Sequence, residues 1–360
     1  MSFSRIAGGA LLLLLVTACV APRTQTPDVD PDLVAAEAAR QKEFVLRDWL
    51  ANQERLNRIA YPLLAGAVPL CGETVRASIG ALATNSQSFL PDYRAAAAAV
   101  IGGDDRLRLV HVIDGFPAAE AGLAVGDLIV SVNGVAAPRG ENAIEEWLER
   151  LDDLLDDGGP FTMTVLRDGE QRTVRIEPRT ICDYPVHFNP SGVINAYADG
   201  KALHVNAGML RFAADDQELA MAIAHEIAHN AMGHIQAMQS NTMAGGLGGL
   251  ILDVLAAVGG INTGGVFSQA GAQAAGSTYS VAFEKEADYV GLYIMANAGL
   301  EIEGAANFWR RMATANPGSI ELAETHPTSP DRFLAVEQTI EEIKLKRELG
   351  LPLMPAMKSP

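Results

Sequence analysis

One pair of histidines has a spacing that suits a metal ion. His225 and His229 lie four residues apart in an apolar stretch, and the pattern predicts a helix over residues 215–238 that Asp215 caps. Because residues four apart project from the same face of a helix, the two imidazoles can share one ion. Glu226 lies on an adjacent face, within reach of a water on that ion but not placed as a ligand. Such a set suits zinc-dependent hydrolysis, in which the carboxylate takes a proton from the water.

The apolar flanks of this motif favour a metal site. Two imidazoles and a carboxylate buried in such a helix cost several kcal/mol unless they are paired or ligated, which disfavours the alternative of an ordinary polar helix face. A catalytic zinc also needs a third protein ligand and an open fourth position. Downstream, Glu284 and Asp288 are again four apart and share a helix face, with Glu286 between them as a competing ligand.

With this second element the chain resembles the zinc metallopeptidases of family forty-eight, over roughly residues 185–340. That group includes the bacterial heat-shock membrane protease, the CAAX-prenyl endopeptidases, and lipoprotein and periplasmic quality-control peptidases. The resemblance implies one Zn²⁺ per chain, with Glu284 as the third ligand beside the two histidines. It also implies that Asp288 supports the site by orienting one histidine. Glu286 ranks behind Glu284, because it would lie on a different face from Asp288.

A third element follows near the C-terminus. The segment Thr325-His326-Pro327, with Arg332 six residues after the histidine, resembles the His-Pro segment and arginine of the same family. The resemblance implies that His326 lies near the metal, either stabilising the oxyanion or occupying the open zinc position in a resting state. Arg332 is expected to assist the transition state, which needs a cationic or hydrogen-bonding donor. Alternatively, His326 only caps a helix that starts near Pro330.

A separate domain of short strands is expected over residues 76–180. The string DGFPAAEAGLAVGDLIVSVNG, residues 114–134, resembles the PDZ domains of bacterial periplasmic proteases. Such domains take a peptide C-terminus as an added strand. The loop that would hold the carboxylate, somewhere in residues 78–103, shows no clear match, so a purely structural PDZ domain remains the alternative.

The N-terminus and the cysteines indicate a compartment. Residues 1–18 have the charge, apolar run and small residues of a secretory signal. The run ends at Cys19 in a pattern that resembles the bacterial lipobox, and Val20 favours the outer membrane; the alternative is an ordinary cleaved signal peptide. Cys71 and Cys182 then remain, on either side of the PDZ-like domain. They either form a disulfide or are two buried free thiols.

The remaining elements complete the predicted organisation. A long helix is expected over residues 32–60, and a strand over residues 202–206 resembles the active-site edge strand of such peptidases. The Gly- and Ala-rich stretch 243–280 is read as a lid or buried segment, with membrane contact as the alternative. The fold class is therefore α+β multidomain: a mainly α zincin-like metallopeptidase domain with a small edge sheet, preceded by a β-rich PDZ domain and an N-terminal helix. The expected segments are a signal peptide (1–18), tether and helix (19–75), PDZ-like domain (76–180), metallopeptidase domain (181–349) and tail (350–360).

Composition narrows the function. The formal net charge of −17 over 360 residues makes nucleic acid an unsuitable partner. Together the motifs predict a lipid-anchored zinc endopeptidase of the bacterial cell envelope, facing the periplasm, that hydrolyses extended or misfolded polypeptides in protein quality control. Its partners would be polypeptide substrates, the membrane, and peptide C-termini at the PDZ domain. The alternative is a non-catalytic envelope chaperone or assembly scaffold with a closed zinc site.

Overall fold

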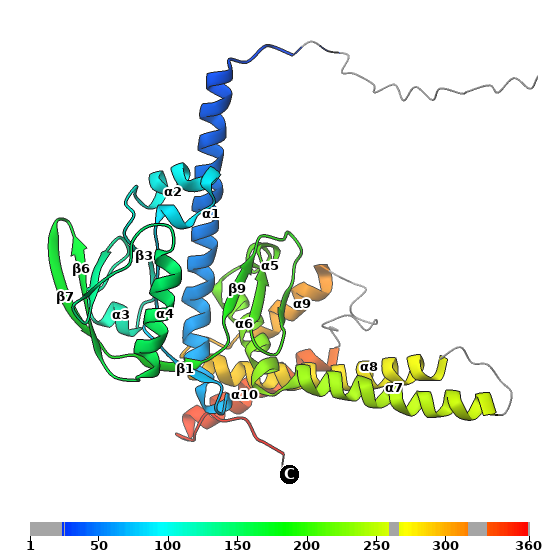
Figure 1. The fold of residues 1–360 in the computed structure, drawn as a ribbon. Coiled ribbons are helices and arrows are strands. Elements are labelled where there is room, and N and C mark those ends of the chain that lie inside the picture. Colours follow the sequence, from blue (N-terminus) through cyan, green and yellow to red (C-terminus); the bar gives the residue numbers. More distant parts are fainter. Residues whose placement is uncertain (1–23, 25, 259–265, 316–329, 359–360) are drawn as a thin grey trace, which may run out of the picture.

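The structure is a computed structural model, and it describes residues 24, 26–258, 266–315 and 330–358. The expectations for the signal peptide, Cys19 and His326 lie outside the described residues. The longest element is α1 (Pro31–Gly66), which starts where the Asp30 carboxylate accepts a hydrogen bond from the Asp32 amide. It runs between the PDZ-like domain on one side and the mainly helical domain on the other (Figure 1).

The PDZ-like domain is built on an antiparallel sheet in the order β2-β3-β4-β6-β7, with β5 paired to β4. Its strands are β2 (Ala81–Thr84), β3 (Arg108–Val112), β4 (Leu128–Val132), β5 (Val135–Ala136), β6 (Phe161–Arg167) and β7 (Glu170–Ile176). Its helices are α2 (Arg94–Ile101), α3 (Pro117–Glu120) and α4 (Ala143–Asp156), with 3₁₀ turns η2 (Ser86–Ser88) and η3 (Pro91–Tyr93). Asn133 and Gly134 both have positive φ, 49° and 77°, as the tight β4–β5 hairpin requires.

A two-stranded sheet closes this domain at its base. After the 3₁₀ turn η1 (Val68–Leu70), β1 (Val75–Ser78) pairs antiparallel with β8 (Arg179–Cys182). Cys71 and Cys182 form a disulfide there, with their Cα atoms 5.9 Å apart. The chain thus enters and leaves the PDZ-like domain at neighbouring positions that the disulfide links.

In its described residues, the second domain combines a small sheet with six helices. The sheet has the order β10-β11-β9 and consists of β9 (Val186–Asn189), β10 (Ala196–Ala198) and β11 (Leu203–Asn206). The helices are α5 (Ala207–Phe212), α6 (Asp216–Ala231), α7 (His234–Val258), α8 (Val266–Asn297), α9 (Ala305–Ala315) and α10 (Pro330–Glu348). Among the described residues, none of the helices combines the length and apolarity needed to span a membrane.

The predicted fold class is confirmed, but two elements differ from expectation. The strand at residues 202–206 is the central β11 rather than an edge, and β10 and β9 form the edges. The helix expected over 215–238 stops at Ala231, because Gly233 adopts a left-handed φ of 67° that ends α6 before α7 begins.

Candidate metal centre

The centre is built on α6, whose apolar sequence keeps it inside the domain. The Asp215 carboxylate accepts a hydrogen bond from the Glu218 amide at 2.9 Å and caps the helix. Further along α6, His225, Glu226 and His229 are all at most 4% exposed. The buried polar groups of the motif must therefore find partners within the protein.

The third group comes from α8, which crosses α6 closely. Gly291 allows the approach, because a Cβ there would lie 3.2 Å from the backbone nitrogen of His225. Two turns earlier on α8, the Glu284 carboxylate lies with one oxygen 3.2 Å from His225 Nε2 and the other 3.2 Å from His229 Nε2. The two Nε2 atoms are themselves 3.1 Å apart.

This arrangement fits a tetrahedral zinc ion. The three donor atoms of His225, His229 and Glu284 all lie within 4.8 Å of one another. Ligands of tetrahedral zinc, each at about 2.0–2.1 Å from the metal, stand roughly 3.3 Å apart, close to the observed separations. Two imidazoles and one carboxylate also form a donor set of catalytic zinc sites, which keep the fourth position open.

On the far side of His225, a buried ion cluster fixes the imidazole. His225 Nδ1 lies 2.9 Å from Asp288 Oδ1, and Arg332 donates to both oxygens of Asp288 at 2.8 and 2.9 Å. Arg332 also lies 3.2 Å from Glu284. Burial alone would raise the pKa of Asp288, but Arg332 and His225 outweigh it and lower that pKa. The carboxylate therefore stays ionised and can accept the Nδ1 proton of His225, which turns the Nε2 lone pair toward the metal position.

His229 has a different partner on its far side. Its Nδ1 atom lies 3.1 Å from Nδ1 of His234, the first residue of α7. Burial, reinforced by the charges of His229 and His225, lowers the pKa of His234 to about 3, so this imidazole is neutral and can accept a proton at Nδ1. Glu286, the competing third ligand, is 48% exposed and lies 3.4 Å from His234 Nε2 rather than at the trio.

Two residues of the centre were not singled out by the sequence. The Arg332 guanidinium stacks on Trp309 of α9, with its Cζ atom 4.5 Å from the centre of the Trp309 ring. Trp309 also meets the His225 ring edge-on, with the two ring centres 4.9 Å apart. Asn230, directly after His229, donates to Ala202 O at 3.1 Å and accepts from the Gly200 amide at 2.9 Å. An amide in an otherwise apolar helix was a usable signal for Asn230, whereas nothing in the local pattern marks Trp309.

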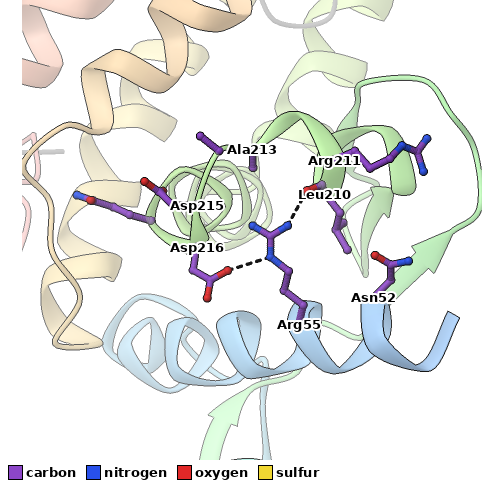
Figure 2. Close-up of a pocket in the computed structure, with 9 residues that line it drawn as sticks. Asn52, Arg55, Leu210, Arg211, Ala213, Asp215 and Asp216 are labelled. Carbon is purple, nitrogen blue, oxygen red and sulfur yellow. Dashed lines mark hydrogen bonds and ion pairs between the residues drawn. The ribbon is translucent and has the colours of Figure 1, made fainter. Parts of the chain in front are cut away.

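A separate cavity of about 850 Å³ lies where α1 meets the start of α6 (Figure 2). Arg55 of α1 crosses it, with Nε 2.9 Å from the Asp216 carboxylate and Nη1 donating to Leu210 O at 2.6 Å. Asp216 also accepts from Arg58 at 2.8 Å. His225, His229 and Glu284 do not line this cavity. The cavity is therefore part of the contact between α1 and the helical domain and not of the metal centre.

Two family models match separate segments of this chain. Residues 182–340 match the model of peptidase family M48, and residues 110–167 match the PDZ domain model. The mitochondrial metalloendopeptidase OMA1 of Schizosaccharomyces pombe is 27% identical over 214 residues, covering 58% of this chain and 62% of that protein. The beta-barrel assembly-enhancing protease of Yersinia pestis is 27% identical over 173 residues, covering 44% and 35%.

The mitochondrial metalloendopeptidase OMA1 of Saccharomyces cerevisiae is 30% identical over 157 residues, covering 40% of this chain and 43% of that protein. The chain thus spans less than two thirds of the length of each of these three relatives. The expected resemblance is confirmed: residues 182–340, which contain the His225, His229 and Glu284 trio, match peptidase family M48, and residues 110–167 match the PDZ domain.

Proposed function

We propose that the protein is a zinc-dependent endopeptidase that hydrolyses peptide bonds in extended or misfolded polypeptides. The observation that carries this proposal is the convergence of His225 Nε2, His229 Nε2 and a Glu284 carboxylate oxygen within 4.8 Å, with Glu226 buried beside His225 on the same helix. A structural zinc site has no use for a buried carboxylate next to its ligands, whereas a hydrolytic site needs one as a base.

In this proposal His225, His229 and Glu284 hold the ion. Zinc bound there would lower the pKa of a coordinated water and polarise the scissile carbonyl. Glu226 takes the proton of the attacking water and returns it to the leaving amine, so that it serves first as a base and then as an acid. Asp288, held by Arg332, keeps His225 in the tautomer that presents Nε2 to the ion.

The substrate is proposed to bind as an added strand. β10 is an edge of the small sheet and packs on α6. The turn between β10 and β11 is hydrogen-bonded to α6, because the Gly200 amide donates to the Asn230 side chain. Within the described part of the PDZ-like sheet, β2 is likewise an edge, paired only with β3. Main-chain pairing at such edges depends little on side chains, which suits misfolded proteins at β10 and polypeptide C-termini at β2.

We place this activity in the bacterial cell envelope, in protein quality control, with Cys19 as the lipid attachment site facing the periplasm. The signal-like N-terminus and the Cys71–Cys182 disulfide support a compartment outside the cytoplasm. The proposed domain limits are 76–180 for the PDZ domain and 181–349 for the peptidase. The competing scaffold function requires His326 as a permanent fourth ligand, and no observation on the described residues favours it.

The test is the Glu226→Gln substitution, which keeps the shape of the side chain but removes the base. Cleavage of an unfolded protein such as casein should fall by about 10²–10⁴, the usual contribution of general acid–base catalysis, while zinc content stays at one ion per chain. Glu341→Gln, an exposed carboxylate on α10, is the matched control and should cleave normally. Undiminished cleavage by Glu226→Gln would overturn the mechanism, and wild-type protein that holds zinc but never cleaves would favour the scaffold.

A further inference from the structure

The segment between the two halves of the metal centre is almost free of charge. From His234 to Phe283 the only Asp, Glu, Lys or Arg is Asp253, in a chain in which 20% of the residues are charged. Residues 234–258 form α7 and residues 266–283 the first part of α8, and the two helices lie side by side and extend away from the rest of the molecule (Figure 1). We call residues 243–258 of α7, together with the start of α8 at Val266, the apolar arm.

Large apolar side chains on this arm face the solvent. Those on α7 are 48–65% exposed, and Val266 at the start of α8 is 60% exposed. The exposed residues of α7 are Met243, Leu247, Leu250, Ile251, Leu252 and Val254. Contiguous exposed apolar surface of this kind marks a site of contact with another molecule or with a membrane.

The single charge of the arm is turned away from that surface. Asp253 is only 8% exposed, and its carboxylate accepts a hydrogen bond from the Ser268 amide at 2.8 Å. Ser268 is the third residue of α8, so the carboxylate satisfies one of the amides that a helix start leaves without an intrahelical partner. The charge thus joins the two helices, and the outer surface of the described arm keeps its apolar character.

The distribution of the exposed residues distinguishes lipid from a protein groove. Met243, Leu247, Leu250 and Val254 form one stripe at helical spacing, as a groove-binding helix would. Ile251 and Leu252 lie outside it, because consecutive residues turn by about 100° each, so that residues 250–252 cover an arc of roughly 200°. A helix that is apolar over so much of its circumference suits surroundings that are apolar on all sides, and a bilayer provides them.

The length of the arm limits how it can enter a membrane. The exposed apolar side chains of α7 lie between Met243 and Val254, over which the helix rises by about 17 Å at 1.5 Å per residue. This is roughly half of a hydrocarbon core of about 30 Å. This agrees with the finding that no described helix can span a bilayer. We propose that the apolar arm inserts into one leaflet of a lipid bilayer and thereby sets the metal centre at a fixed height above the membrane surface.

Insertion can be measured with a tryptophan on the arm, independently of any lipid anchor and of peptidase activity. The full chain with Leu250→Trp is mixed with phosphatidylethanolamine and phosphatidylglycerol vesicles, and its emission is compared with that of the parent protein. The added tryptophan should shift to the blue and lose intensity when the lipids are brominated on their acyl chains. Glu170→Trp, at the exposed first residue of β7, is the matched control and should show neither effect.

Charges placed on the arm should abolish insertion. In the Leu250→Trp background, the pair Leu247→Glu and Ile251→Glu should remove both the blue shift and the quenching. The pair Gln239→Glu and Ser240→Glu, at exposed positions nearer the body on the same helix, should retain them. Unchanged emission on adding vesicles would overturn the proposal. So would a blue shift that needs no vesicles and grows with protein concentration, because a second copy of the chain would then cover the arm.

Discussion

At the scale of single residues, Arg332 is the main group that lowers the pKa of the buried Asp288 carboxyl. It is 1% exposed, and burying a guanidinium costs several kcal/mol unless its charge is matched. Asp288 and Glu284 supply that match, and Trp309 covers the guanidinium face. These contacts lead us to expect that Arg332 acts through Asp288 and Glu284 as a positioning residue, while its role as a transition-state group stays a prediction.

Arg332→Lys keeps the charge but loses the planar fork that bonds both oxygens of Asp288. We expect zinc affinity to fall by about 10–100-fold, the usual effect of changing the groups that orient metal ligands. Competition with a chelator measures this directly. Arg310→Lys, which replaces an exposed arginine of α9, is the control and should bind zinc normally. Equal affinities for the two variants would mean that Arg332 has no role at the metal.

His234 is expected to orient His229 as Asp288 orients His225. His234→Phe preserves the ring that stacks on Phe283 at 4.6 Å but removes the Nδ1 acceptor. Zinc affinity should drop by roughly tenfold or more, and His234→Gln, which keeps an acceptor, should recover part of it. His187→Phe alters an exposed histidine of β9 and serves as the control. If the Phe and Gln variants bind zinc equally, His234 acts by packing alone.

The sequence predicted those parts of the metal centre that depend on the spacing of residues within one helix or on the family resemblance. The face shared by His225 and His229 follows from the helical repeat alone, and Glu284 followed from the resemblance. Trp309 could not be found in this way, because its contact with His225 joins two helices that are far apart in the sequence and depends on how α9 packs on α6.

At the scale of elements, the sequence predicted strands and helices well where side-chain periodicity decides them. The strand expected over residues 202–206 is β11 (Leu203–Asn206), and the helix expected over residues 32–60 lies within α1 (Pro31–Gly66). The sequence could not show that Gly233 would take a left-handed conformation and divide the motif helix. Nor could it order β9, β10 and β11, since strand pairing is a nonlocal choice.

The PDZ-like sheet depends on one buried ion pair. Asp127 is 1% exposed, lies 2.6 Å from Arg167 Nε and accepts a hydrogen bond from the Ala124 amide at 2.9 Å. Burial would raise the pKa of Asp127, but Arg167 and the amide outweigh it and lower that pKa below 3.8. Because the folded pKa is depressed, this contribution to stability is present at neutral pH and is lost as the pH falls below about 4.

Asp127→Asn should therefore destabilise the PDZ-like domain by about 1–3 kcal/mol at neutral pH, since the charged hydrogen bonds from Arg167 are weakened while its partly exposed guanidinium can still reach water. Its stability should also depend less on pH than that of the wild type below about pH 4. Urea unfolding at several pH values tests both effects, with Asp157→Asn, an exposed residue at the end of α4, as the control. Parallel pH profiles for the wild type and Asp127→Asn would contradict the assignment.

At the scale of the whole molecule, α1 and the disulfide join the two domains. Buried residues of α1, among them Leu56 and Leu63, belong to the core cluster of the helical domain. That same cluster includes Phe116 of the PDZ-like domain, whose ring meets Tyr61 of α1 at 5.6 Å. Cys71 and Cys182 lie in this cluster as well, so the staple sits where the two domains and α1 meet.

Removing the staple should lower stability without touching the metal centre. The disulfide closes a loop with a sequence separation of 111, which the chain-entropy model values at about 4–5 kcal/mol because the cross-link restricts the unfolded chain. The double variant Cys71→Ser and Cys182→Ser should therefore unfold at clearly lower urea concentration, while its zinc affinity stays that of the wild type. Reductant should lower the midpoint of the wild type toward that of the variant and leave the variant unchanged. Coincident unfolding curves for the oxidised wild type and the double variant, or two free thiols in protein purified from the envelope, would contradict a stabilising role for this bond.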